Sequence, residues 1–170
     1  WVGVDDRLVH SFYTKIVDLD NFEETMDSLG KIIEGTLNER LLFQDAKDVL
    51  IEASDRGWVS ACVSASPYEL LKNKLIKANI FDYFSFVIGG NLVERNKPYP
   101  DIYNKAIAEL QTTKNIVIED SPPGIAAGKA SDTYVVAVDR GIFSETELSR
   151  ADVIVDNLTI DVIEKAFNSL

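Results

Sequence analysis

The chain has 170 residues and a formal net charge of −11, from 28 acidic and 17 basic side chains. That length can bury the core of one ordinary domain, with room for a small appended lobe. So acidic a chain, with no cluster of Lys and Arg, is poorly suited to the phosphate backbone of nucleic acid, and we expect no such partner. No apolar run approaches the roughly 20 residues that cross a bilayer, so we expect no membrane partner either.

The single cysteine, Cys62, excludes an internal disulfide and suits a reducing compartment. Residues 1–10 contain neither the basic segment nor the apolar block of a signal peptide. The sequence therefore predicts a cytoplasmic protein. His10 is the sole histidine, which argues against a histidine-based triad or a zinc site, and Cys62 reads as packing within an apolar strand.

Residues 1–42 predict a helical hairpin, set as a partial cap before the rest of the chain. The two helices are expected over residues 5–17 and 22–39. In the first, Leu8, Phe12 and Ile16 give one apolar face. In the second, the apolar positions approximate another face: Phe22, Met26, Leu29, Ile33 and Leu37.

Residues 43–170 alternate helix-like and strand-like segments and predict an α/β core. Apolar strands that alternate with amphipathic helices indicate a parallel sheet with helices on both faces, a Rossmann-like fold. The expected helices span residues 45–56, 67–79, 100–110, 122–130 and 159–167, and the expected strands span residues 58–63, 84–88, 115–118, 134–138 and 152–155.

Three of the predicted strands are followed by residues that could bind phosphate and a cation. Ser64-Ala65 follows the first strand, Lys97 lies in the loop after the second, and Glu119-Asp120 follows the third. Ligands bind beyond the carboxyl ends of such strands, so these residues should share one rim of the sheet. A hydroxyl, backbone N–H groups and a lysine can hold phosphoryl oxygens, and carboxylates bind Mg²⁺.

Each of these residues also has a purely structural explanation. Taken singly, Ser64 is most simply a small strand-end residue and Lys97 a solvated charge. The acidic pair is more informative, because adjacent carboxylates after an apolar strand repel each other unless a cation or hydrogen bonds intervene. An N-cap role for Asp120 or Ser121 before Pro122 is compatible with function. The ordered combination favours a phosphoryl-transfer site.

The ordered runs carry a family resemblance. Residues 63–66 read Val-Ser-Ala-Ser, residues 97–103 read Lys-Pro-Tyr-Pro-Asp-Ile-Tyr, and residues 118–127 read Ile-Glu-Asp-Ser-Pro-Pro-Gly-Ile-Ala-Ala. Over residues 43–170 the chain resembles the haloacid dehalogenase superfamily, in particular its beta-phosphoglucomutase and sugar-phosphatase branch.

The resemblance implies a role for each matching position. Ser64, Ala65 and Lys97 would contact the transferring phosphoryl group, Glu119 and Asp120 would hold Mg²⁺, and Gly124 would permit the turn into the next helix.

The chain departs from that family at its start. The family opens with a strand that ends in Asp-x-Asp-Gly-Thr, whose first Asp is the nucleophile, and this motif is absent here. Aligning Val2 to Ser11 with that motif would put Gly3 at the position of the nucleophile. No apolar strand precedes this segment, and too few residues would remain after it for a cap. Asp5 and Asp6 read better as the acidic start of a helix.

The family's nucleophile strand lies between the strands that end at Ser64 and Glu119. Without it, both neighbours would expose unpaired backbone groups, which is costly in the middle of a sheet. We therefore expect the core of residues 43–170 to lack its first strand. An omitted N-terminal segment, a separate bound fragment or a swapped partner would supply it.

The predicted activity is Mg²⁺-dependent phosphoryl transfer, most simply hydrolysis of a small phosphorylated metabolite such as a sugar phosphate. Residues 1–170 alone should have negligible activity. A beta-phosphoglucomutase-type mutase and an inactive phosphometabolite-binding module remain open alternatives. A response-regulator-like receiver fits less well, because its acidic pair follows the first strand and it has no helical lid. A true dehalogenase would not need the Glu119-Asp120 pair.

Overall fold

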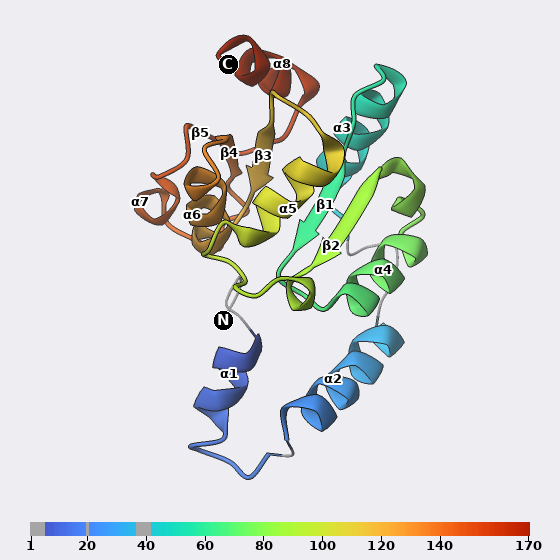
Figure 1. Cartoon of the computed structure of the whole chain (residues 1–170), viewed down its shortest axis with the longest axis vertical. Coiled ribbons are helices and arrows are strands. Elements are labelled where there is room, and N and C mark those ends of the chain that lie inside the picture. The colour runs from blue at the N-terminus through green and yellow to red at the C-terminus, as the bar shows by residue number, and fades with distance from the viewer. Residues whose placement is uncertain (1–5, 20, 37–41) are drawn as a thin grey trace.

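A computed structural model of the chain describes residues 6–19, 21–36 and 42–170. It places two helices, α1 (Asp6–Tyr13) and α2 (Phe22–Thr36), apart from an α/β core (Figure 1). The predicted hairpin thus forms, although α1 ends four residues early because residues 14–17 turn away from the helix axis. The expected end of the second helix, residues 37–39, lies outside the described residues. Across the described ranges, no helix is both long and apolar enough to cross a membrane.

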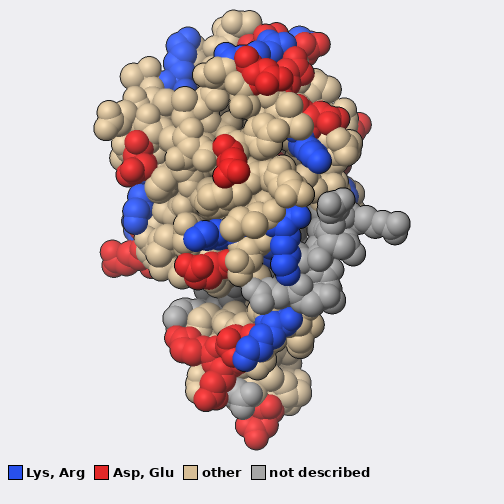
Figure 2. Space-filling view, turned by 90° about the vertical axis from the view of Figure 1, so that its right-hand side faces the viewer, with Lys and Arg blue, Asp and Glu red and all other residues tan. Residues whose placement is uncertain are grey.

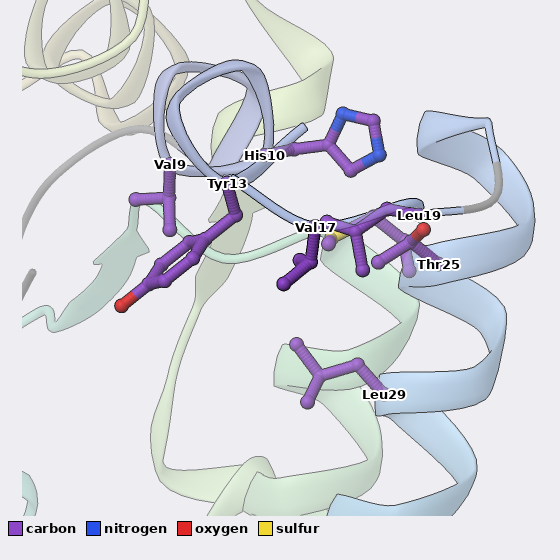
Figure 3. A pocket seen from close by; sticks show the side chains of 8 residues that line it. Val9, His10, Tyr13, Val17, Leu19, Thr25 and Leu29 are labelled. Atoms are coloured by element: carbon purple, nitrogen blue, oxygen red, sulfur yellow. The ribbon is translucent and has the colours of Figure 1, made fainter. Parts of the chain in front are cut away.

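The two cap helices enclose an apolar pocket of about 300 Å³, to which α1 contributes Val9, His10 and Tyr13. Figure 3 shows these side chains with Val17, Leu19, Thr25 and Leu29. The apolar face predicted for α1 was therefore wrong in its register. Phe12 is 43% exposed and Ile16 64% exposed, and neither lines the pocket, to which α1 contributes Val9, His10 and Tyr13 instead.

The core confirms the predicted α/β fold, with most boundaries within a few residues of expectation. The helices are α3 (Gln44–Asp55), α4 (Tyr68–Lys77), α5 (Asp101–Leu110), α6 (Pro122–Ala130), α7 (Glu145–Leu148) and α8 (Ile160–Asn168), with short 3₁₀ turns η2 (Phe81–Tyr83) and η3 (Gly90–Leu92). The strands are β1 (Ala61–Ser64), β2 (Phe86–Gly89), β3 (Ile116–Glu119), β4 (Tyr134–Val138) and β5 (Val153–Val155).

Every strand pairing among the described residues is parallel, but the pairings form two separate groups. β1 pairs with β2, and β4 lies between β3 and β5. Helices cover both faces, as predicted. On β4, Val135 packs with the α5 and α6 side chains, whereas Val136 packs with those of α3 and α8.

Between the two groups runs an apolar groove of about 610 Å³. Its walls include Ala61, Cys62 and Val63 of β1 and Ile116 and Val117 of β3. In Figure 1 these two strands face each other without a strand between them. This is the position at which the family resemblance places a further strand, and the identity of that strand stays a prediction.

A partly buried ion pair ties α3 to two distant loops of the core. Asp45 accepts two hydrogen bonds from the Arg140 guanidinium, at 2.8 and 3.1 Å, and one from the Leu158 N–H at 2.9 Å. Burial alone would raise the pKa of Asp45, but these bonds and the Arg140 charge hold it below its usual value. Elsewhere the charges are mixed, and Figure 2 shows acidic and basic side chains interspersed on one face of the molecule.

Candidate active site

A pocket of about 400 Å³ opens at the carboxyl ends of β1 and β3. All five predicted site residues, Ser64, Ala65, Lys97, Glu119 and Asp120, line it. The pocket also includes Ser66 and Ile118 from the runs quoted above, together with residues for which the sequence predicted no role, chiefly Phe43, Val138, Arg140 and Leu158. The parallel strands thus bring together residues that are far apart in sequence, at the rim where such folds bind ligands.

Ser64 is the last residue of β1, and the loop after it is tightly held. Its Oγ accepts a hydrogen bond from the Ser66 N–H at 3.1 Å, and the Asn96 side-chain amide donates to the Ala65 carbonyl at 3.0 Å. Gly90 lies against this loop, where an added Cβ would overlap the Ala65 carbonyl and Asn96. The Ser64 hydroxyl proton remains available to an anion in the pocket.

Lys97 is buried, with only 7% of its side chain exposed. Its Nζ donates to Glu119 Oε1 at 2.5 Å and to the Val63 carbonyl at 3.0 Å. The ammonium also lies 5.0 Å from the centre of the Tyr103 ring. An ammonium has three N–H donors and the described chain uses two of them, so one remains for a ligand.

Glu119 is almost fully buried, and both of its oxygens accept hydrogen bonds. Oε1 accepts from Lys97 and from the Tyr103 hydroxyl, the latter at 2.6 Å. Oε2 accepts from the Ser121 hydroxyl at 3.1 Å and the Asp120 N–H at 3.2 Å. Burial alone would raise the pKa of Glu119, but the Lys97 charge and these hydrogen bonds outweigh it and lower the pKa.

Gly124 has a different role from the one that the resemblance implied. It lies in the first turn of α6, and Ser121 is the N-cap, accepting the Gly124 N–H at 3.3 Å. A Cβ at position 124 would overlap the Glu119 carboxyl group. Gly124 therefore makes room for that carboxylate; it is not a turn residue with special backbone angles. The predicted N-cap role for Ser121 is confirmed.

Asp120 faces the pocket beside this buried network. Its surface is exposed, and none of the other described residues donates a hydrogen bond to its carboxylate. Partial desolvation at the pocket wall and the negative charge of Glu119 raise the pKa of Asp120. A partly desolvated carboxylate that lies beside another carboxylate, and that no other described residue supplies with a hydrogen bond, is well suited to meet a cation.

The carboxylates at this pocket can supply part of the ligands of a Mg²⁺ site. Within the described ranges, no group of three or more His, Cys, Asp or Glu side chains is placed to enclose a metal. Mg²⁺ does not require such a cage, since it is commonly held by one or two carboxylates together with waters and substrate phosphate. Asp120, with Glu119 directly behind it, could supply that share.

Sequence reasoning gave no role at this site to Tyr103 or to Arg140, although the loop after Arg140 was expected beside it. Tyr103 reaches Glu119 from the buried face of α5, and Arg140 borders the pocket while it is held by Asp45. Tyr103 ends the run of residues 97–103 that carries part of the family resemblance, but the sequence assigned it no role. No local pattern indicated that its hydroxyl would meet a carboxylate 16 residues away.

Comparison with known proteins agrees with the observed fold and gives the family of the chain. The family model for haloacid dehalogenase-like hydrolases matches residues 7–138. That match covers most of the chain, so the protein belongs to this family, as the resemblance predicted.

Two curated relatives illustrate the match. Phosphoglycolate phosphatase of Pectobacterium atrosepticum is 30% identical over 160 residues, which are 92% of this chain and 64% of that protein. The bifunctional riboflavin kinase/FMN phosphatase of Arabidopsis thaliana is 39% identical over 85 residues, 48% of this chain and 22% of that protein. The chain therefore spans less than two thirds of the length of these relatives.

Solved structures share the fold. Beta-phosphoglucomutase from Clostridium difficile superposes with a TM-score of 0.82 at 21% identity, over 98% of this chain and 78% of that one. CbbY from Rhodobacter sphaeroides, solved in complex with phosphate, gives a TM-score of 0.76 at 17% identity, over 90% of this chain and 73% of that one. At such identities the likeness establishes the architecture alone.

Proposed function

We propose that this chain forms the phosphate- and metal-binding side of a Mg²⁺-dependent enzyme that hydrolyses a small phosphorylated metabolite. The observation that carries the proposal is the convergence of Ser64, Lys97 and Asp120 on one pocket at the carboxyl rim of a parallel sheet. The matching relative from Pectobacterium is a phosphoglycolate phosphatase, which supports a small phosphorylated acid or sugar phosphate as the class of substrate.

The residues of the chain have separable tasks in this proposal. The Ser64 hydroxyl and the Ala65 N–H donate to two oxygens of the phosphoryl group, and the remaining Lys97 N–H donates to a third. These donors are held in place before the substrate arrives, so the charge that shifts in the transition state meets fixed dipoles. Asp120, with Glu119 directly behind it, would hold Mg²⁺, which when bound neutralises charge on the phosphoryl oxygens.

The nucleophile would come from outside residues 1–170. The groove between β1 and β3 offers unpaired edges of two parallel strands and apolar walls. An apolar strand that ran parallel to both would deliver its last residue to the pocket beside Ser64 and Asp120. An aspartate there could attack phosphorus, and water would complete the hydrolysis. A second hydroxyl in place of water would make the same site a mutase.

The test supplies this strand in trans. Residues 1–170 are assayed for phosphate release from phosphoglycolate and a hexose phosphate, with Mg²⁺ and a synthetic peptide of five apolar residues followed by Asp-Leu-Asp-Gly-Thr. We expect release with this peptide, and none with a matched peptide whose first Asp is Asn. Isomerised hexose phosphate without net release would indicate the mutase.

Two further outcomes decide the remaining parts of the proposal. Activity that survives both chelation and Asp120→Ala would contradict the assignment of the metal. Inorganic phosphate that binds to residues 1–170, without turnover under any condition, would favour the inactive binding module over the enzyme.

A further inference from the structure

Glu119 occupies an unusual position for a residue expected to bind a cation. A carboxylate has about four lone-pair sites, and in Glu119 each oxygen already accepts two hydrogen bonds. The side chain is 7% exposed and packs against Gly124, which leaves no space for a further side chain on that side. To reach a cation, Glu119 would have to give up at least one buried donor, which is costly.

Tyr103 supplies the donor that closes this set. Its hydroxyl is 2.6 Å from Glu119 Oε1, the same atom that accepts from Lys97. Its ring lies under the Lys97 ammonium, 5.0 Å from Nζ to the ring centre. Tyr103 thus contacts both members of the ion pair from the buried side of α5, but it does not line the substrate pocket.

We infer that Tyr103 is a positioning residue: it holds Glu119 as the buried counter-ion of Lys97, so that Lys97 aims its remaining N–H at a phosphate oxygen and Asp120 alone meets the cation. The inference rests on the proposed function and refines it, because it separates two adjacent carboxylates into different roles. Glu119 serves the phosphate side through Lys97, and Asp120 serves the metal side.

The alternative is that Tyr103 only packs in the core. It is 6% exposed and belongs to the buried cluster around Ile88 and Ile102, so a large truncation would damage the fold under either reading. Tyr103→Phe avoids this, because it keeps the ring beneath Lys97 and removes only the hydroxyl. Tyr99→Phe is a matched control, since Tyr99 is 51% exposed and its ring faces Arg95 instead.

Binding of inorganic phosphate in the presence of Mg²⁺ is measured by calorimetry on four forms of the chain: wild type, Tyr103→Phe, Lys97→Met and the double variant. We expect Tyr103→Phe to weaken phosphate binding about five- to tenfold, which is within the net range of one ordinary hydrogen bond because Tyr103 acts on the phosphate only through Lys97. In the Lys97→Met background the same change should have no further effect, because Tyr103 acts through Lys97. Mg²⁺ affinity should stay within about twofold, and Tyr99→Phe should change neither value.

If Tyr103→Phe weakens phosphate binding equally in both backgrounds, Tyr103 does not act through Lys97. A large loss of Mg²⁺ affinity in Tyr103→Phe would instead show that Glu119 binds the cation.

The side-chain NMR signal of the Lys97 ammonium tests the contact between Tyr103 and the ion pair without any ligand. It should be sharp in the wild type and broadened by faster proton exchange in Tyr103→Phe. An unchanged signal would overturn the inference, whereas a wild type that shows this signal but binds no phosphate would overturn only the proposed function.

Discussion

At the scale of single residues, Gly124 shows how much the site depends on the space around Glu119. The nearest atoms to a Cβ built at Gly124 are the carboxyl atoms of Glu119. An alanine there must displace that group, and with it the acceptor that both Lys97 and Tyr103 share. The position therefore links helix α6 directly to Lys97, the lysine that we propose binds phosphate.

Gly124→Ala should destabilise the chain by about 1–3 kcal/mol, the usual cost of overpacking a buried site, and should weaken phosphate binding as well. Chemical denaturation and phosphate calorimetry measure the two effects. Gly30→Ala in helix α2 is the control, because a Cβ there meets nothing within 4 Å and alanine favours a helix. Equal stability of Gly124→Ala and the wild type would contradict the packing described for Glu119.

Cys62 gives a second prediction at this scale. Burial raises the pKa of its thiol to about 11, and the nearby Lys97 charge offsets only part of that shift. Since the thiolate is the reactive form, alkylation by iodoacetamide should be slow at pH 8 and should accelerate about tenfold per pH unit up to pH 10. The unfolded chain should level off near pH 9. A folded chain that levels off at the same pH would place Cys62 in open solvent.

At the scale of elements, the sequence was informative about periodicity and less so about pairing. The helix at Pro122–Ala130 and the strand at Tyr134–Val138 match their predicted bounds, because the N-cap serine and the uninterrupted apolar run mark them locally. The first strand begins three residues later than predicted, at Ala61, since Trp58 instead packs edge-on against Phe167 of α8. Such long-range packing has no signature in the local sequence.

The candidate site likewise combines features that the local sequence indicates with features that depend on long-range packing. Ser64, Lys97 and Asp120 could be predicted, because each lies at or after the end of an apolar strand. The roles of Tyr103 and Gly124 could not, because they depend on one carboxylate that residues from three segments approach in space. Likewise, the inward face of α1 depends on how α2 packs against it, which the helical period alone does not fix.

The Asp45–Arg140 pair belongs to the scale of elements, since it fixes α3 to the loop after β4 and the loop before α8. Asp45→Asn should cost about 1–3 kcal/mol at neutral pH, the range for hydrogen bonds to a charged group. The pKa of Asp45 is lower in the folded chain than in the unfolded chain. The ionised Asp45 therefore contributes its full share of the folding stability above the ordinary aspartate pKa, and this share is lost as the pH falls through the folded pKa.

The variant should therefore lose less stability than the wild type between pH 5 and pH 2, as measured by denaturant unfolding at each pH. Glu52→Gln serves as the control on the same helix, because Glu52 pairs with Arg56 at the surface and is 47% exposed. Parallel pH profiles for Asp45→Asn and the wild type would show that the pair contributes nothing to folding.

At the scale of the whole molecule, the core divides into two parallel groups of strands with an apolar groove between them. The active-site pocket opens at the end of that groove, so one inserted strand could both complete the sheet and deliver a reactive group. Helices α1 and α2 lie at one end of the molecule, where α2 contacts α4 of the core, and an apolar pocket lies between α1 and α2.

The most direct test of the central claim is a titration of the isotope-labelled chain with inorganic phosphate, followed by amide NMR with and without Mg²⁺. We predict that signals of residues 64–66 and 119–121 shift together, that Mg²⁺ strengthens the effect, and that Asp120→Asn removes the strengthening. Phosphate that shifts only one of these two segments, or binds equally well with and without Mg²⁺, would contradict a single site for phosphate and cation.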